Sequence, residues 1–152
     1  MRLSAAGLEL LKKSEGFRGR TYLDAAGHPT IGYGHRLVDP ETYPGGVSEA
    51  EGEAMLLHDV GEAEQAVNRL VKVALTQGQF DALVDFVFNL GAERLACSTL
   101  LAELNAGRYD SAGGQLLRWD HVGGEAAAGL RARREAELRL WSGDESGRPA
   151  VA

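Results

Sequence analysis

Apolar residues recur along this chain with a helical spacing, except in one short early stretch that is rich in strand-forming residues. Leu3, Leu8 and Leu11 recur at near-helical spacing around Ser4, a favoured N-cap residue, and predict a first helix over residues 4–13. The runs "TYL" and "TIGYG" come next and are rich in β-favouring residues. Because "DAAGHP" between them is typical of a turn, the two runs predict a β-hairpin.

The remainder of the sequence is patterned for helices. Ser48 with Glu51, and Thr76 with Gln79, have the spacing of a capping box, in which two side chains reciprocally cap the first turn. These pairs predict a long helix from Ser48 to residue 71 and a core helix that ends at Gly91. Further elements are expected as helices over residues 98–106, 110–117 and 128–141 and as loops over 36–47 and 119–125. Strands confined to one early patch and followed by helices make the predicted fold class α+β.

The length and composition are those of a globular protein. With 152 residues, of which 44% are hydrophobic, the chain is expected to form one domain over residues 1–141, followed by a polar, mobile tail over 142–152. No apolar run approaches the ~20 residues that a bilayer span needs. The formal net charge of −6 argues against nucleic-acid binding. Cys97 is the only cysteine, so no internal disulfide can form, and we expect this residue to be a small apolar filler.

The candidate chemistry lies in the least regular stretch, "SEGFRGRTYLDAAGHPTIGYGH", which contains Glu15, Asp24 and Thr30. Each has a plain structural interpretation: an exposed carboxylate, the first residue of an Asx turn, and a strand former. Together they meet the needs of glycosidic-bond cleavage, in which one acid protonates the leaving oxygen and a second carboxylate stabilises the positive charge or activates water. A helix end facing a hairpin can hold two carboxyls across a sugar, and the hydroxyl of Thr30 can bind a water.

This stretch resembles the signature of the phage-type lysozymes, the endolysins of glycoside hydrolase family 24, in which Glu, Asp and Thr recur at the same separations. The resemblance continues in "FDALVDFVFNLG", "STLLAELNAGRYD" and "GLRARREAELRLW", and covers nearly all of residues 3–141. It implies a lysozyme-like fold: a small N-terminal lobe with a β-hairpin, a larger all-helical C-terminal lobe, a long helix joining them and a glycan cleft between. It also implies that Glu15 is the general acid, Asp24 the second carboxylate and Thr30 the residue that positions water.

The resemblance extends to residues outside this stretch. Phe88 and Asn89 match positions that face the cleft in the family, and Arg131 matches a position that pairs with the catalytic Glu. These three are the expected substrate-binding residues. Arg36 matches a cleft-edge position that is usually apolar in the family, so the resemblance assigns it no sugar contact.

Histidines are expected to be structural. His35 and Asp59 match a His–Asp pair of the family that we expect to tie the two lobes together. Neither His28 nor His58 has partners at metal-ligand spacing, so we expect no metal, and nothing in the sequence calls for a cofactor.

The resemblance implies an N-acetylmuramidase that hydrolyses the β-1,4 bond between N-acetylmuramic acid and N-acetylglucosamine in bacterial peptidoglycan. Two alternatives stay open: a lytic transglycosylase, which needs only one acid, and a peptidoglycan-binding module without catalysis. Retention of Asp24 and Thr30 favours hydrolysis. The expected protein is a monomer whose partner is peptidoglycan, with no nucleic acid and no stable membrane anchor. We expect it to stay in the host cytoplasm until it passes through a holin-type lesion and acts on the cell wall.

Overall fold

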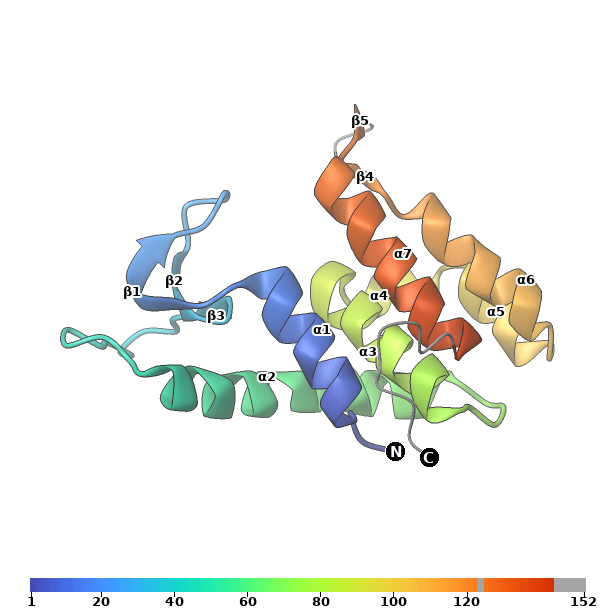
Figure 1. Ribbon diagram of the computed structural model, residues 1–152, viewed down its shortest axis with the longest axis horizontal. Coiled ribbons are helices and arrows are strands. Elements are labelled where there is room, and N and C mark those ends of the chain that lie inside the picture. The colour runs from blue at the N-terminus through green and yellow to red at the C-terminus, as the bar shows by residue number, and fades with distance from the viewer. Residues whose placement is uncertain (123–124, 144–152) are drawn as a thin grey trace, which may run out of the picture. The chain divides into compact units, whose positions relative to one another are not determined.

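A computed structural model describes residues 1–122 and 125–143 of the chain, and Figure 1 shows the order of the elements. The helices are α1 (Ala5–Glu15), α2 (Glu49–Leu70), α3 (Gln77–Leu90), α4 (Ala92–Ala96), α5 (Thr99–Asn105), α6 (Tyr109–Gln115), the 3₁₀ helix η1 (Leu116–Arg118) and α7 (Ala128–Ser142). The strands are β1 (Arg18–Leu23), β2 (Pro29–Gly32), β3 (His35–Arg36), β4 (His121–Val122) and β5 (Glu125–Ala126). This mixture of helices and small antiparallel sheets confirms the predicted α+β class. Within the described ranges, no helix combines the length and hydropathy of a bilayer span.

Contacts between residues divide the chain into two compact units. One comprises Leu8–Glu62, and the other comprises Met1–Gly7 together with Ala63–Ala152. Both boundaries fall inside helices, so α1 and α2 each contribute residues to both units. We call Leu8–Glu62 the sheet unit, because it contains β1, β2 and β3, and the other part the α3–α7 unit.

The sheet unit is built on an antiparallel sheet in the order β1-β2-β3. Tyr22 pairs with Thr30, and Thr30 pairs with Arg36, so these three residues form one row across the sheet. Strand β2 passes close to α2, where a Cβ on Gly32 would lie 3.4 Å from the Cα of Gly52. The buried core of this unit contains Leu11, Ile31, Tyr33, Val47, Leu56 and Val60.

The long helix α2 begins as the sequence predicts. The Ser48 hydroxyl accepts from the backbone N–H of Glu51 at 3.1 Å, and the Glu51 carboxylate accepts from the N–H of Ser48 at 3.1 Å. The capping box is therefore present, and it satisfies N–H groups that the first turn leaves without helical partners.

The α3–α7 unit is built around α3, whose residues from Phe80 to Val87 are all buried. Thr76 and Gln79 form the second predicted capping box, with hydrogen bonds of 2.9 and 3.1 Å. Helices α3 and α7 pack closely, and a Cβ on Gly78 would overlap the carbonyl oxygen of Leu140. The remaining large core side chains of this unit are Val67, Leu95, Leu100, Leu101, Leu104, Leu116 and Trp141.

Several local expectations were incomplete. The expected hairpin is a three-stranded sheet, because β3 adds to it. The expected loop 119–125 contains β4 and the start of β5, which pair antiparallel, so the C-terminal part of the chain is not all-helical. Helix α4 was not expected at all. These elements span two to five residues, too few for a periodicity to be visible in the sequence.

Two further expectations concern single positions. Cys97 is exposed at the C-terminus of α4, so its prediction as an apolar filler was wrong. Of the expected tail 142–152, Ser142 ends α7 and Gly143 is its C-cap, with a φ of 70°. The rest of that tail lies outside the described residues.

Candidate active site

Asp24 follows β1 and opens the turn that leads into β2. Its Oδ1 accepts hydrogen bonds from the backbone N–H groups of Ala26 and His28, each at 2.9 Å. The bond from His28 is the main cause that lowers the pKa of Asp24 below its ordinary value, because it stabilises the anion. The Asx turn expected as the plain interpretation is therefore present. It also fixes the carboxylate, since Oδ1 is held by the turn and Oδ2 lies outside these bonds.

Thr30 is joined to the same turn through the backbone of His28. The Thr30 hydroxyl donates to the carbonyl oxygen of His28 at 2.9 Å, and that oxygen also accepts from the backbone N–H of Asp24 at 2.9 Å. Thr30 is only 2% exposed. Because its proton is directed at His28, its oxygen is left to accept a hydrogen bond. The backbone of His28 thus sets the positions of both side chains, a role that residue type alone does not reveal.

Glu15 is the last residue of α1 and is half-buried. Its carboxylate lies against Gly34, where a Cβ would be 2.9 Å from Glu15 Oε2. Gly34 has a φ of 73°, which favours glycine. Gly34, the second glycine of "TIGYGH", therefore makes room for the Glu15 carboxylate in the turn from β2 to β3, a function that sequence reasoning missed.

Two basic side chains lie beside the Asp24 carboxylate. Arg36 Nε is 3.4 Å from Asp24 Oδ2, and the Arg36 side chain is 63% exposed. His28 Nδ1 is 3.5 Å from Asp24 Oδ1, and its side chain is 54% exposed. A negative carboxylate in the sheet unit is thus flanked by a permanent cation and by a group that becomes cationic on protonation.

His35 and Asp59 form the expected pair, with 2.6 Å between His35 Nδ1 and Asp59 Oδ2. On the other side of the ring, His35 Nε2 is 3.0 Å from a carboxylate oxygen of Glu41. Partial burial lowers the pKa of His35, but these hydrogen bonds outweigh it and raise that pKa above its ordinary value. All three residues belong to the sheet unit, so the expectation that the pair ties the lobes together was wrong: it joins β3 to α2 within one unit.

The other expected site residues lie in the α3–α7 unit. Phe88 and Asn89 are half-buried in the last turn of α3, and Asn89 Oδ1 accepts from Arg134 at 2.8 Å. Arg131 is exposed on α7 and forms hydrogen bonds with Glu135 at 3.0 Å and Asp120 at 3.3 Å. Roles for these three in substrate binding stay predictions.

A buried ionic cluster in this unit was not foreseen. Arg133 donates two hydrogen bonds to Asp85, each at 2.9 Å, and Arg134 donates to Glu137 at 2.6 Å. Burial, together with a hydrogen bond to Asp85, raises the pKa of Glu137 well above its ordinary value. Runs of arginine are usually solvated, so the sequence carried no indication that Arg133 and Arg134 are buried.

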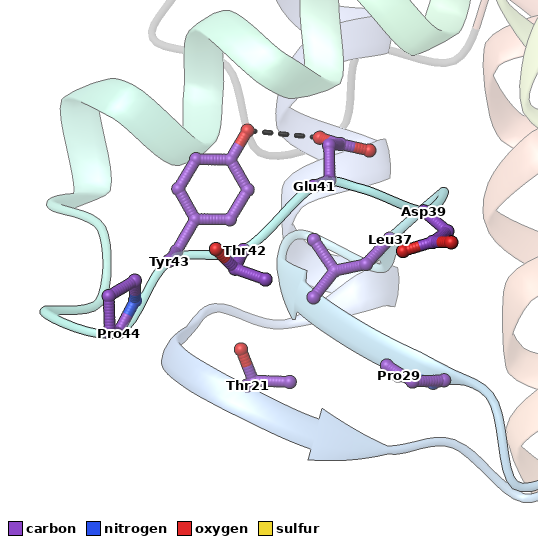
Figure 2. Close-up of a pocket in the computed structure, with 8 residues that line it drawn as sticks. All are labelled: Thr21, Pro29, Leu37, Asp39, Glu41, Thr42, Tyr43 and Pro44. Atoms are coloured by element: carbon purple, nitrogen blue, oxygen red, sulfur yellow. Dashed lines mark hydrogen bonds between the residues drawn. The ribbon is translucent and has the colours of Figure 1, made fainter.

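The sheet unit also has an open pocket of about 430 Å³, shown in Figure 2. Its lining residues are Thr21, Pro29, Leu37, Asp39, Glu41, Thr42, Tyr43 and Pro44. The Tyr43 hydroxyl donates to Glu41 at 3.0 Å. None of the three candidate catalytic residues lines this pocket. Within residues 1–122 and 125–143, no three or more His, Cys, Asp or Glu residues are grouped so that they could hold a metal ion.

Known proteins resemble this chain over most of its length. The endolysin of Acyrthosiphon pisum secondary endosymbiont phage 1 is 37% identical over 149 residues, which cover 93% of this chain and 98% of that protein. The endolysin of Bacillus phage B103 is 43% identical over 96% of this chain, which spans only 56% of that longer protein. Among solved structures, an endolysin from Escherichia coli O157:H7 phage FAHEc1 has a TM-score of 0.85 at 35% identity, with 99% of this chain and 98% of that chain covered.

The same relationship appears at the level of the family. The family described as phage lysozyme matches residues 12–137, which include Glu15, Asp24 and Thr30 as well as α7 up to Glu137. The match therefore covers both units and nearly all of the described chain. This chain belongs to the phage lysozyme family.

Proposed function

We propose that this protein is an endolysin-type muramidase, which hydrolyses the β-1,4 bond between N-acetylmuramic acid and N-acetylglucosamine in peptidoglycan. Membership of the phage lysozyme family supports a glycoside hydrolase. The observation that carries the assignment of the site is the turn around His28, whose backbone binds both the Asp24 carboxylate and the Thr30 hydroxyl. Two groups of the candidate set are thereby oriented before any substrate arrives.

In this mechanism Glu15 donates a proton to the glycosidic oxygen as the bond to the leaving sugar breaks. Asp24 stabilises the positive charge that develops on the sugar, or activates the attacking water. Its Oδ1 is held by two backbone N–H groups, so Oδ2 is the oxygen that faces the reaction. The Thr30 oxygen accepts a hydrogen bond from the water and aligns it, since its own proton is directed at His28.

Phe88, Asn89 and Arg131 are proposed to bind the glycan from the α3–α7 unit. Phe88 offers an apolar ring of the kind that packs against a sugar. Asn89 keeps its amide N–H₂ as a donor, because its oxygen is bound by Arg134. Arg131 contributes a cation from the exposed side of α7.

The products of purified peptidoglycan test this function. The wild-type protein should release soluble muropeptides with new reducing ends, and Asp24→Asn should lower the rate by about 10²–10⁴-fold. Products that carry a 1,6-anhydro ring would instead identify a lytic transglycosylase. Sedimentation with peptidoglycan but no soluble product would identify a glycan-binding module.

The route to the cell wall is a separate proposal. We propose that the protein accumulates in the host cytoplasm, as a monomer, until a holin-type lesion opens the membrane and it reaches the cell wall. Expression in a bacterial host should then cause lysis only when a holin is co-expressed or the membrane is permeabilised. Lysis by the protein alone would contradict this route, and sedimentation equilibrium of the purified protein tests the monomer.

A further inference from the structure

We propose that Arg36, which lies immediately beside Asp24, is a specificity residue. It binds a carboxylate of the peptide that muramic acid carries. Arg36 lies opposite Thr30 in the pairing of β2 with β3, and its Nε is 3.4 Å from Asp24 Oδ2. Its guanidinium therefore lies beside the Asp24 carboxylate, and its backbone pairs with that of Thr30. This inference rests on the proposed function, since it assigns a further contact to the same substrate.

The guanidinium has the capacity to bind a second group. It carries five N–H donors in a planar fork that matches a carboxylate. Only Nε has a partner among the described residues, and the side chain is 63% exposed. The two terminal N–H₂ groups are thus available to a ligand that approaches Asp24.

Arg36 is not needed to hold Asp24 in place. The backbone N–H groups of Ala26 and His28 already bind Asp24 Oδ1 at 2.9 Å. An ion pair of 3.4 Å with a side chain as exposed as that of Arg36 contributes little in water. A role toward the substrate therefore accounts for the position of Arg36 better than a role toward the protein.

The charge pattern around the site favours an anionic group. The chain has a net charge of −6, and the segment 37–68 contains eight acidic residues without a single Lys or Arg. In contrast, residues 18–36 contain three arginines and only one carboxylate, that of Asp24. Arg18 is already placed over the ring of Tyr22, 4.4 Å from its centroid, whereas Arg36 faces Asp24. The strands that carry the site thus form a locally basic segment of an acidic protein. The peptides of peptidoglycan bear free carboxylates, which such a segment attracts.

A pair of substrates isolates this interaction. Native peptidoglycan is compared with the same material after its carboxylates have been converted to neutral methylamides, which keeps the glycan and removes the charge. The wild-type protein is compared with Arg36→Leu, with Arg36→Lys and with Arg20→Leu, which removes an exposed arginine from β1 of the same sheet. The readout is kcat/KM for soluble product, at low and high salt.

Arg36→Leu should lower kcat/KM on native peptidoglycan by about three- to fivefold, which corresponds to the free energy of an exposed ion pair. Its kcat/KM on the methylamidated substrate should equal that of the wild type. The wild-type protein should therefore prefer native over methylamidated peptidoglycan. Arg36→Lys should retain part of this preference and Arg20→Leu should retain all of it. High salt should weaken the preference, because it screens the charges. Equal losses on both substrates, or a shift of the acidic limb of the pH profile on both, would show that Arg36 acts through Asp24 and would overturn the inference. No loss on either substrate would overturn it as well.

Failure of the proposed function would look different. If the wild-type protein releases no product, hydrolysis is excluded, and sedimentation with native and methylamidated peptidoglycan then measures the same contact by binding. Weaker sedimentation of Arg36→Leu with the native material alone would still support the carboxylate contact. Identical sedimentation of wild type and Arg36→Leu with both materials would overturn it.

Discussion

At the scale of single residues, the candidate site depends on backbone and glycine positions as much as on carboxylates. The peptide groups around His28 hold Asp24 and Thr30, and the missing side chain of Gly34 leaves room for Glu15. Neither feature is itself a candidate reacting group, yet both determine where the candidate groups lie. The site is therefore sensitive to substitutions that leave every proposed catalytic side chain intact.

Replacing Gly34 with alanine tests this sensitivity. The new Cβ would lie 2.9 Å from Glu15 Oε2 at a φ of 73°, so the carboxylate must move and the backbone is strained. We expect Gly34→Ala to lose about 1 kcal/mol of unfolding free energy and to reduce kcat by about tenfold or more. Peptidoglycan hydrolysis and urea unfolding measure the two effects.

Gly107→Ala is the matched control for Gly34→Ala. Gly107 has a φ of 82°, but a Cβ there would meet nothing within 4 Å, and it lies outside the sheet unit. It should lose a similar unfolding free energy and keep its activity. If Gly34→Ala were as active as Gly107→Ala, the contact between Gly34 and Glu15 would be irrelevant to catalysis.

At the scale of elements, polar contacts hold the short strand β3 in place. His35 bonds to Asp59 of α2 and to Glu41 of the following loop. Backbone and side-chain hydrogen bonds, first among them that from the Val38 N–H, lower the pKa of Glu41 to about 2. Since Glu41 and Asp59 flank the ring, the sheet unit is stabilised by a histidine in its charged form.

The stability of the sheet unit should therefore depend on pH through His35. Because the pKa of His35 is raised in the folded state, its contribution is complete below its ordinary value of 6.5 and is lost as the pH rises through the folded-state pKa. The contribution of Glu41 has the opposite sign: it is present above the ordinary value of 4.5 and is lost as the pH falls toward about 2. The Tm difference between wild type and His35→Asn should be largest near pH 5.5 and shrink by pH 8.5.

His58→Asn is the control for that series, because the side chain of His58 is 91% exposed. It should lower Tm little at either pH. A Tm difference between wild type and His35→Asn that grew from pH 5.5 to pH 8.5 would contradict the charged pair.

Helix packing supplies a second prediction at this scale. A Cβ on Gly78 would overlap the Leu140 carbonyl oxygen of α7, so Gly78→Ala should destabilise the protein by about 1–3 kcal/mol. Gly61 lies inside α2, and a Cβ added there would meet nothing within 4 Å, so Gly61→Ala should stabilise by about 0.5–1 kcal/mol. Chemical unfolding of both variants checks the signs. Equal effects of the two substitutions would contradict the close contact between α3 and α7.

Local sequence information predicted the elements that carry their own start signals. The capping boxes at Ser48 and Thr76 gave the beginnings of α2 and α3, and the β-favouring runs "TYL" and "TIGYG" gave two of the three strands of the first sheet. The strands β3, β4 and β5 and helix α4 span two to five residues, which is too short for a periodicity to be visible. The exposure of Cys97 is likewise a tertiary property, with no local indication.

At the scale of the whole molecule, the candidate site was predictable only through resemblance. Spacing allowed Glu15, Asp24 and Thr30 to act together, whereas the family signature gave each a role, and the family match covers residues 12–137. Only the structure reveals the bonds of the His28 backbone, the space at Gly34 and the position of Arg36 beside Asp24. Sequence therefore identified the candidate reacting groups, and structure identified what surrounds them.

The central claim, that Glu15 is the acid of a peptidoglycan hydrolase, is tested most directly by comparing Glu15→Gln with Glu9→Gln. Both substitutions remove one carboxylate from α1, and Glu9 is 73% exposed. The measurement is the appearance of reducing ends from purified peptidoglycan, with circular dichroism to verify folding. Glu15→Gln should release reducing ends about 10²-fold or more slowly than the wild type, whereas Glu9→Gln should match the wild-type rate. A folded Glu15→Gln that is as active as Glu9→Gln would contradict the account.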